Sequence, residues 1–222
     1  CHSTILLFAM QSLQHYSTIY AACFLSIIAD KYTLYGFCLL ASIYLLLRGQ
    51  YWSFILFSFA TFGVGFAIKF VKVMVAYPRP EIMINLLGPT AFPSGHVGLY
   101  YTTVLALAAM FSHSFPRYKT TAFRIAHLSN ILVALSRVYL QAHWLTDIVG
   151  GVIIGYLFYL APYALVSCRR LQFDHTPAVS IHLAGLFASL ALIVPLSRLH
   201  IPTLTYHYNP HYYLIENRTH LL

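Results

Sequence analysis

The stretch GQYWSFILFSFATFGVGFAI, residues 49–68, contains no charged side chain over its entire length. A helix that crosses the hydrocarbon core of a bilayer needs about 20 mostly apolar residues. Further uncharged runs of useful length recur along the chain, at 1–29, 32–47, 82–116, 148–168 and 175–197. This repetition predicts an all-α fold, a polytopic bundle of membrane helices.

The composition supports a chain that partitions into lipid. Of 222 residues, 59% are hydrophobic and 8% are charged, against about 25% charged in ordinary soluble domains. These values exclude a disordered protein, a collagen-like fibre and a freely soluble enzyme. The net charge of +8 includes no basic run longer than Arg169-Arg170. A nucleic-acid partner would need a clustered basic stripe, so the expected partner is the lipid bilayer.

Helical spans follow from the apolar runs. We predict six core spans and a seventh, C-terminal span, at 14–29, 33–48, 51–71, 97–114, 122–140, 147–168 and 178–196. Residues 1–176, with a core at 33–168, form the main membrane domain, and 177–222 add a span and a tail. The tail is rich in Tyr and His from Pro202 onward. Its spacing matches no metal-ligand pattern, and we interpret it as an interfacial aromatic segment.

Basic residues in the connections predict the orientation. They follow the second, fourth and sixth spans, as Arg48, Arg117, Lys119, Arg124, Arg169 and Arg170. The positive-inside rule makes these three connections cytoplasmic. The connections 73–96 and 138–146 then lie on the opposite side, where Lys31 is a mild exception to the charge bias. Nearly all residues with distinctive chemistry fall in these two non-cytoplasmic connections.

Three short motifs stand out there. They are Lys72-x6-Arg79-Pro80, Pro93-Ser94-Gly95-His96 and Ser136-Arg137-x5-His143-x3-Asp147. Each alone has an ordinary explanation: a lysine can extend from a helix end to the interface, and a His–Asp pair can stabilise a helix. Polar groups at membrane depth are costly, however. Three cations, two histidines and one carboxylate on one side of the membrane therefore point to a shared site.

The cations indicate a multiply charged anion, and phosphate is the obvious candidate. Arginine at 79 and 137 offers planar, forked donors that match phosphate oxygens, while Lys72 supplies a compact charge. Ser94 and Gly95 directly precede an expected helix, whose backbone N–H groups and positive dipole end favour an anion. Gly95 also lets the backbone approach closely, because it has no Cβ.

The two histidines suggest a division of labour. If 143–147 are helical, His143 and Asp147 lie on the same face and can form a hydrogen bond. The carboxylate would fix the imidazole tautomer and leave the other nitrogen free to attack phosphorus. His96 would serve as general acid and base. With Asp147 and Glu81 as the nearest acids, we expect no metal and no cofactor.

In this order and spacing, the three motifs resemble the signature of the type-2 phosphatidic acid phosphatase superfamily. The signature positions, between 72 and 147, match without departures, and the helices over 33–168 fit the family's six-span layout. The resemblance implies a helical-bundle membrane phosphatase acting on lipid phosphates. It implies His143 as nucleophile, His96 as acid and base, and Asp147 as the residue that orients the nucleophile. It also implies a set of phosphate ligands: Lys72, Arg79, Ser94, Gly95 and Arg137.

Three functions are consistent with these residues. The first is a metal-independent phosphatase that hydrolyses a lipid phosphomonoester or diphosphate through a phosphohistidine. Its substrate would be a lipid such as undecaprenyl diphosphate, phosphatidic acid, phosphatidylglycerol phosphate or lipid A. It would lie in a bacterial inner or other plasma membrane, with its site on the non-cytoplasmic face. The second is a phosphoryl or headgroup transferase using the same site. The third, a non-catalytic phospholipid-binding or transport protein, is disfavoured because binding alone needs only the cations.

Overall fold

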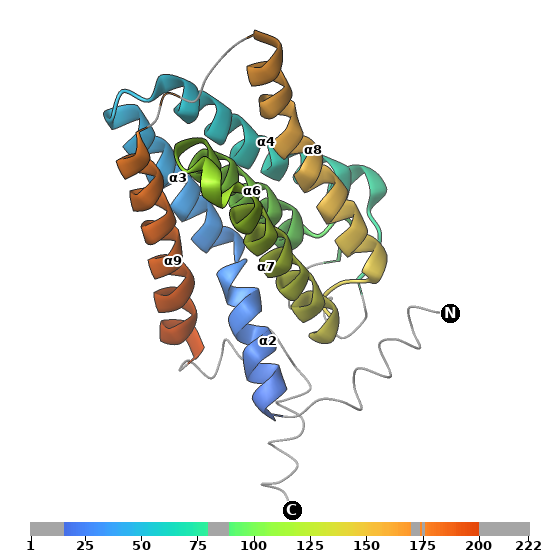
Figure 1. Ribbon diagram of the computed structural model, residues 1–222. Coiled ribbons are helices and arrows are strands. Elements are labelled where there is room, and N and C mark those ends of the chain that lie inside the picture. Colours follow the sequence, from blue (N-terminus) through green and yellow to red (C-terminus); the bar gives the residue numbers. More distant parts are fainter. Residues whose placement is uncertain (1–15, 80–88, 170–173, 175, 200–222) are drawn as a thin grey trace, which may run out of the picture.

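The computed structural model describes residues 16–79, 89–169, 174 and 176–199, which form a helical bundle (Figure 1). The α-helices are α2 (Tyr16–Ile28), α3 (Lys31–Leu47), α4 (Tyr51–Val75), α6 (Gly95–Ser114), α7 (Lys119–Tyr139), α8 (Leu145–Arg169) and α9 (Pro177–Leu199), with the 3-10 helix η1 (Pro116–Tyr118) before α7. Among the described residues, extended pairing is limited to one isolated bridge, Pro78 with Thr90. The predicted all-α fold is confirmed.

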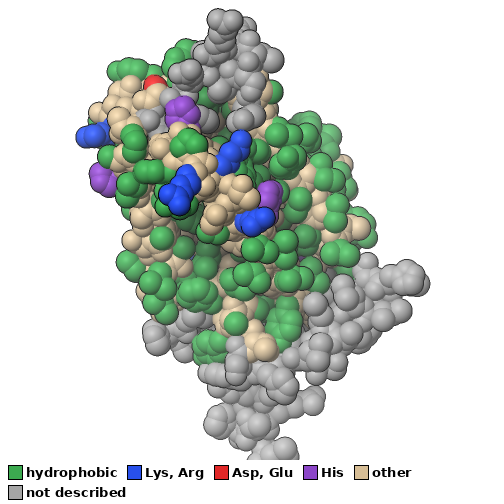
Figure 2. Space-filling model, in the orientation of Figure 1, with side chains coloured by type: hydrophobic (Ala, Val, Ile, Leu, Met, Phe, Trp, Pro, Cys, Tyr) green, Lys and Arg blue, Asp and Glu red, His purple; other side chains and the backbone are tan. Residues whose placement is uncertain are grey.

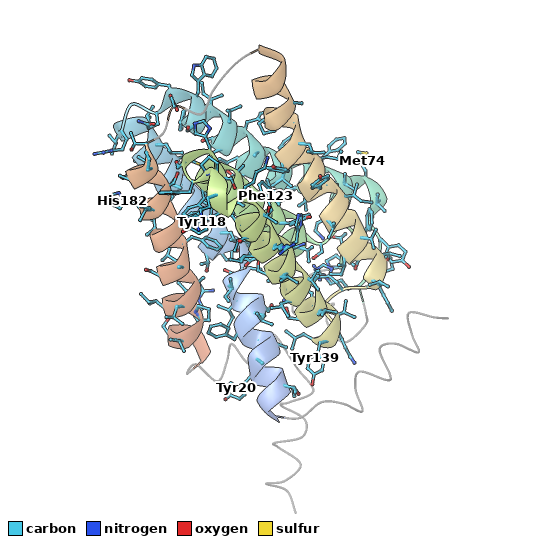
Figure 3. The ribbon with its side chains drawn as sticks, viewed as in Figure 1. Tyr20, Met74, Tyr118, Phe123, Tyr139 and His182 are labelled. Atoms are coloured by element: carbon cyan, nitrogen blue, oxygen red, sulfur yellow. The ribbon has the colours of Figure 1, made fainter. Side chains whose placement is uncertain are left out.

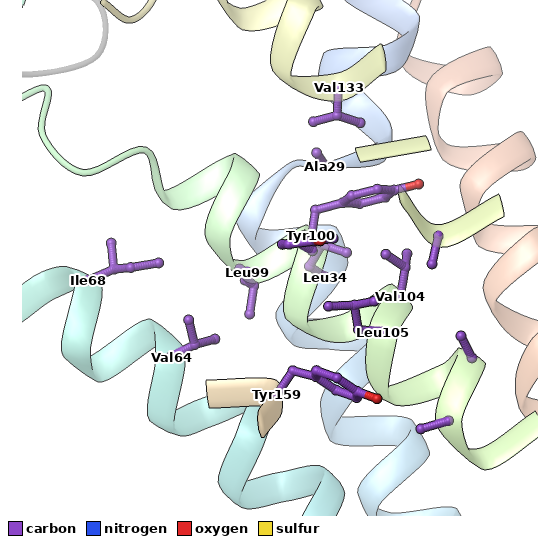
Figure 4. Packing of buried hydrophobic residues seen from close by; sticks show 14 residues of the cluster. Ala29, Leu34, Val64, Ile68, Leu99, Tyr100, Val104, Leu105, Val133 and Tyr159 are labelled. Atoms are coloured by element: carbon purple, nitrogen blue, oxygen red, sulfur yellow. The ribbon is translucent and has the colours of Figure 1, made fainter. Parts of the chain in front are cut away.

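Helix α6 lies at the centre of the bundle and packs against α3, α4, α7, α8 and α9. Apolar side chains of α4, such as Val64 and Ile68, meet Leu99 and Leu105 of α6 in the main core (Figure 4). Tyr159 of α8 closes this cluster from another side. Because α6 begins at Gly95, the same packing fixes the position of the Ser94-Gly95-His96 motif.

Glycines bring α6 and α8 into backbone contact. A Cβ placed on Gly155 would lie 2.7 Å from the carbonyl oxygen of Gly98, and one on Gly151 would lie 2.7 Å from that of Ser94. The hydroxyl of Thr102 also donates to the carbonyl of Gly155 at 2.9 Å. Small residues at this spacing let membrane helices approach closely. The contact joins the start of α6 to the start of α8, which carry two of the three motifs.

Apolar side chains cover much of the face of the bundle seen in Figure 2, and many large hydrophobic residues are exposed. Large side chains such as Leu47 (80% exposed) and Phe66 (76% exposed) point away from the bundle. Four stretches of the described helices are long and apolar enough to cross a bilayer: Thr18–Leu47, Tyr51–Val75, Leu145–Pro162 and Pro177–Arg198. A surface of this kind is stable against lipid rather than water. The chain is an integral membrane protein.

The predicted spans correspond to the described α-helices with small shifts at their ends, but the relation between the first two spans differs. Helix α2 is described over Tyr16–Ile28. It continues after Ala29 and Asp30 into α3, and the two together make the single apolar stretch Thr18–Leu47. The number of crossings thus stays a prediction, and the tail from residue 200 lies outside the described residues.

Polar side-chain pairs fasten the outer helices to the bundle. The hydroxyl of Thr18 in α2 lies 2.6 Å from that of Tyr139 in α7, at the end of the bundle where α7 finishes (Figure 3). Near the other end, the Tyr44 hydroxyl of α3 lies 2.7 Å from Nδ1 of His182 in α9. The second contact places α9, the predicted seventh span, against α3 rather than apart from the bundle.

An aspartate between α8 and α9 caps the start of α4. The backbone N–H groups of Trp52 and Ser53 each donate to the Asp174 carboxylate at 3.0 Å. Burial alone would raise the pKa of Asp174, but these donors outweigh it and lower the pKa. Helix starts leave such N–H groups without intrahelical partners, so Asp174 ties the α8–α9 connection to α4. This end of the bundle also holds Arg48 and Arg117.

Candidate active site

The predicted site residues come together around one cavity of about 810 Å³. Six of them line it: Lys72, Arg79, Gly95, His96, Arg137 and His143. The other two stand directly behind this wall, because Asp147 contacts His143 and Ser94 donates its backbone N–H to the carbonyl of Asp147 at 2.9 Å. The cavity lies at the end of the bundle formed by the α4–α6 and α7–α8 connections.

The His143–Asp147 pair is present but is built differently from the expectation. Nδ1 of His143 lies 3.2 Å from Oδ2 of Asp147, with both side chains buried. Helix α8 begins at Leu145, so His143 lies in the connection before it, and the pair forms although residues 143–147 are not helical throughout. The same Oδ2 accepts the backbone N–H of Trp144 at 2.8 Å. Asp147 thus reaches back from the first turn as in a capping box, and this fixes its orientation.

Arg79 defines the tautomer of His143. Its Nη1 lies 3.3 Å from Nε2 of His143 and donates to the carbonyl of Ala142 at 2.7 Å. A guanidinium can only donate, so Nε2 must be the accepting, unprotonated nitrogen. Nδ1 then carries the proton and donates it to Asp147. The lone pair of Nε2 points toward Arg79 at the cavity wall. An anion bound to Arg79 would therefore lie next to Nε2.

The surroundings of His143 keep its imidazole neutral. Burial lowers the pKa of His143 well below its usual value, and the charges of Arg137, Arg79 and Lys72 lower it further. Both effects disfavour the protonated, charged form. Although Asp147 is a hydrogen-bond partner, both effects favour a neutral imidazole whose Nε2 is unprotonated and lies next to Arg79.

A short pairing of two loop segments places Lys72 and Arg79. After α4, Ala76 takes a left-handed conformation with φ of 46°, and the chain turns back. Arg79 N–H then donates to Pro89 at 3.1 Å. Lys72 Nζ donates to the carbonyl oxygens of Thr90 and Ala91 at 3.3 and 2.8 Å. The loop thus holds both cations by backbone contacts at the cavity wall.

The remaining predicted groups differ in their environment. Arg137 is fully buried and donates from Nη1 to the Ser26 hydroxyl. Ser94 is the N-cap of α6, yet its hydroxyl makes no cap hydrogen bond. Among the described residues, Ser94 Oγ and His96 Nε2 have no hydrogen-bond partner although both atoms are buried. Such groups are costly unless a ligand satisfies them. Gly95 faces the cavity, and a Cβ there would make only an ordinary contact, 3.7 Å from Ile68.

Sequence reasoning missed part of this cavity. Its wall also includes Asp30, Lys31, Lys69 and Arg198. Arg198 of α9 donates to the Asp30 carboxylate at 3.2 Å. Lys69 is three residues before Lys72 and shares its helix face, so it could have been found from spacing. Lys31, the exception to the charge bias, lies at the site.

Side chains that commonly bind metal ions do not cluster in the described part of the chain. Within 16–79, 89–169, 174 and 176–199, no three His, Cys, Asp or Glu side chains gather closely enough to hold a metal ion. The donors at the cavity are mainly cationic, and cations repel a metal ion. The donor set therefore suits an oxyanion.

The fold and the cavity define a class: a helical membrane protein with a cation-lined, histidine-containing oxyanion site. The PAP2 superfamily model matches residues 51–171, more than half of the chain. The chain belongs to the PAP2 superfamily. That match contains all three motifs.

Two similar proteins come from Bacillus subtilis. Phosphatidylglycerophosphatase B of strain 168 is 32% identical over 72 residues, which are 31% of this chain and 36% of that protein. The matched segment thus spans about a third of the relative's length. A crystal structure of a transmembrane PAP2-type phosphatidylglycerolphosphate phosphatase aligns with a TM-score of 0.68 and 19% identity. It covers 76% of this chain and 86% of that one, and shows the shared fold.

Proposed function

We propose that the protein is a membrane lipid phosphatase that hydrolyses a phosphate ester or diphosphate of a membrane lipid without a metal ion. The observation that carries this proposal is the chain of contacts from Asp147 to His143 to Arg79, at 3.2 and 3.3 Å. It presents an unprotonated nitrogen next to a fixed cation. Membership of the PAP2 superfamily and the named activity of the Bacillus relatives support the same conclusion.

The first chemical step is attack by His143. The Nε2 lone pair forms a bond to phosphorus while the bond from phosphorus to the lipid oxygen breaks. Protonated His96 donates its proton to that oxygen, and the lipid leaves as an alcohol or a shorter phosphate. Burial and the neighbouring cations lower the pKa of His96, and the two negative charges of a bound phosphate oppose this effect and favour the protonated form. Lys72, Arg79 and Arg137 balance the charge on the non-bridging oxygens.

The second step removes the phosphoryl group from His143. Neutral His96 takes a proton from water as the water oxygen attacks phosphorus. The bond from phosphorus to Nε2 breaks, and its electron pair returns to the imidazole. Inorganic phosphate leaves and His96 is protonated again, so atoms and charges balance over the cycle. Asp147 holds the Nδ1 proton throughout and stabilises positive charge on the ring.

The location of the site follows from the arrangement of basic residues. Helix α3 ends and α7 begins at one end of the bundle, whereas α4 and α7 end at the other (Figure 1). Arg48, Arg117 and Lys119 adjoin the first end, and the cavity residues Arg79, Arg137 and His143 adjoin the second. By the positive-inside rule we propose that the cavity faces the non-cytoplasmic side, in a bacterial inner or other plasma membrane. A lipid phosphate in that leaflet could reach the site without crossing the bilayer.

The proposal is tested by phosphate release from the purified full chain. Phosphatidic acid, phosphatidylglycerol phosphate, undecaprenyl diphosphate and lipid A are supplied in neutral detergent with EDTA. We expect release from at least one of them. His143→Gln should lower kcat by about 10⁴-fold or more, as when a triad nucleophile is lost. The matched control is His127→Gln, since His127 is exposed on α7 and bonded to Tyr101 rather than to the cavity.

Three results would contradict the proposal. They are no release from any lipid, substantial activity in His143→Gln, or loss of activity in EDTA that a divalent ion restores. Adding an alcohol acceptor separates hydrolysis from transfer, because a transferase would convert the acceptor into a new phosphate ester.

A further inference from the structure

A second group of cations lines the same cavity, outside the three motifs. Lys31 begins α3, Lys69 lies in α4 and Arg198 lies near the end of α9. All three face the cavity that contains His96 and His143. None of them contributes to the chemistry described above. We call Lys31, Lys69 and Arg198 the outer cations, and Lys72, Arg79 and Arg137 the inner cations.

One face of α4 connects the two groups. The cavity is lined there by Gly65, Ile68, Lys69 and Lys72, a spacing that keeps side chains on the same side of a helix. Lys69 and Lys72 are therefore neighbours along the wall, with Cβ atoms about 5–6 Å apart. Two anionic groups of one substrate can bind to these two ammonium groups at once.

The charges around the cavity fall into two matching sets. The inner cations with Asp147 leave two net positive charges, which one phosphomonoester balances, since it carries about two negative charges. The outer cations with Asp30 leave two more. Among the described residues, neither Lys31 nor Lys69 forms an ion pair with an acid. Lys31 and Lys69 are exposed at the cavity wall, so their ammonium groups are available to a second anionic group of the substrate, and a substrate with one phosphate would not use them.

The size of the cavity agrees with a larger ligand. Small-molecule sites measure about 300–1,000 Å³, and the volume of about 810 Å³ here lies in the upper part of that range. It accommodates a complete headgroup beside the scissile phosphate. Arg198 is held toward the cavity by Asp30, whose carboxylate also accepts the N–H groups of Tyr32 and Thr33 at the start of α3.

We infer that the outer cations form a second anion-binding site, which holds a second phosphate group of the lipid substrate while His143 attacks the first. This inference rests on the proposed function and narrows it to lipids with two phosphate groups. The second group is either the inner phosphate of a diphosphate or a phosphodiester in the headgroup. Both offer the same anionic oxygens to Lys31, Lys69 and Arg198.

The test compares substrates within each variant. Phosphatidic acid has one phosphate, phosphatidylglycerol phosphate adds a phosphodiester, and undecaprenyl diphosphate adds a bridged phosphate. In neutral detergent, Lys69→Gln should lower kcat/KM about tenfold or more for at least one two-phosphate lipid, mainly through KM. For phosphatidic acid the loss should stay within about threefold. Lys31→Gln should lower kcat/KM for the same lipids. Lys69→Arg keeps the positive charge and should restore most of the kcat/KM that Lys69→Gln loses.

The matched control is Lys119→Gln, which removes an exposed lysine at the opposite end of the bundle and should not change the preference. The inference is overturned if Lys69→Gln and Lys31→Gln reduce all lipids equally or none of them. It is also overturned if their effect appears only in anionic vesicles and not in neutral detergent, because the outer cations would then bind bilayer lipid. A loss for phosphatidylglycerol phosphate would show that the second site binds a headgroup phosphodiester. A loss for undecaprenyl diphosphate would show that it binds the inner phosphate of a diphosphate.

A binding measurement separates this inference from the proposed function. In a His143→Gln background, Lys69→Gln should weaken binding of two-phosphate lipids about tenfold and that of phosphatidic acid far less. If the wild-type chain releases no phosphate from any lipid, the proposed function fails, and this binding difference still tests the second site. Equal weakening for all lipids would contradict the second site even if the phosphatase activity is established.

Discussion

The inner and outer cations line one cavity but are held in different ways. Lys72 and Arg79 donate to backbone carbonyl groups, and Arg137 is fully buried. In contrast, Lys31 and Lys69 are exposed, and the side chain of Arg198 is 32% exposed. Donors fixed before substrate arrives can stabilise a transition state, because they need no reorganisation during the reaction. Exposed, flexible cations contribute to binding and selection instead.

One aspartate lies beside each group of cations, Asp147 at the inner group and Asp30 at the outer group. Replacing these two aspartates gives the largest expected difference in kcat. Asp147→Asn should lower kcat by about 10³–10⁴-fold, because the amide no longer fixes the tautomer of His143. Asp30→Asn removes the partner of Arg198 at the outer group and should change kcat by less than about tenfold. Steady-state kinetics of both variants on one lipid measures the difference. Similar losses in the two variants would remove the distinction between the groups.

Vanadate should bind to the inner cations as a mimic of the transferring phosphoryl group. We expect inhibition by millimolar vanadate or less, weakened about tenfold by Arg79→Gln, which removes a charged donor. Lys69→Gln should weaken it by no more than about threefold, since a single oxyanion does not extend to the outer group. Inhibition constants for the three proteins test this. Full activity in millimolar vanadate, or equal effects of both variants, would contradict the assignment.

The inner charges should also be visible in the titration of His143. Burial and the neighbouring cations lower its pKa, so the ring should stay neutral at pH 6.5 and gain a proton only at lower pH. Arg79→Gln removes a positive charge and should raise the pKa of His143, whereas Lys119→Gln should leave it unchanged. Histidine ¹⁵N NMR in detergent, with His143→Gln for assignment, measures both shifts. A ring that is protonated at pH 6.5 in the wild-type chain would contradict the neutral nucleophile.

The smallest expected effect is on the stability of the fold. The positions of the inner cations depend on the fold through the close contact between α6 and α8. Gly155→Ala would place a Cβ 2.7 Å from the carbonyl oxygen of Gly98, and overpacking of this kind costs about 1–3 kcal/mol. The melting temperature in detergent should fall. Gly185→Ala is the control, since no described atom lies within 4 Å of its Cβ, and it should be neutral or slightly stabilising. Equal melting temperatures would show that the α6–α8 contact is not tight.

The sequence predicted the helices well because apolar run length determines where a membrane span can lie. Residues 51–71 and 147–168 closely match α4 and α8. The charges of Asp30 and Lys31 marked the break between α2 and α3. They did not reveal that the two helices follow each other as one apolar stretch, since hydropathy does not give the direction of the chain after a break. The predicted span bounds placed His143 before the helix, but they did not reveal that the Asp147 carboxylate accepts the Trp144 N–H in this turn.

The cavity was less predictable than its motifs. Spacing pointed to the inner cations and both histidines, because these lie in two connections or in the helix ends beside them. The position of Lys69 three residues before Lys72 was a usable signal for the outer group. Arg198 gave none, because it reaches the site only through the packing of α9 beside α2. Contacts between helices so distant in sequence cannot be read from local pattern.

The central claim is that Nε2 of His143 attacks a phosphate held by the inner cations. Its most direct test is a rapid acid-free quench of the full chain during turnover of ³²P-labelled phosphatidic acid or another lipid that it hydrolyses. We predict a base-stable, acid-labile label on His143, absent from His143→Gln and retained in His127→Gln. Label on a different residue, or none during active turnover in repeated early quenches, would contradict the account.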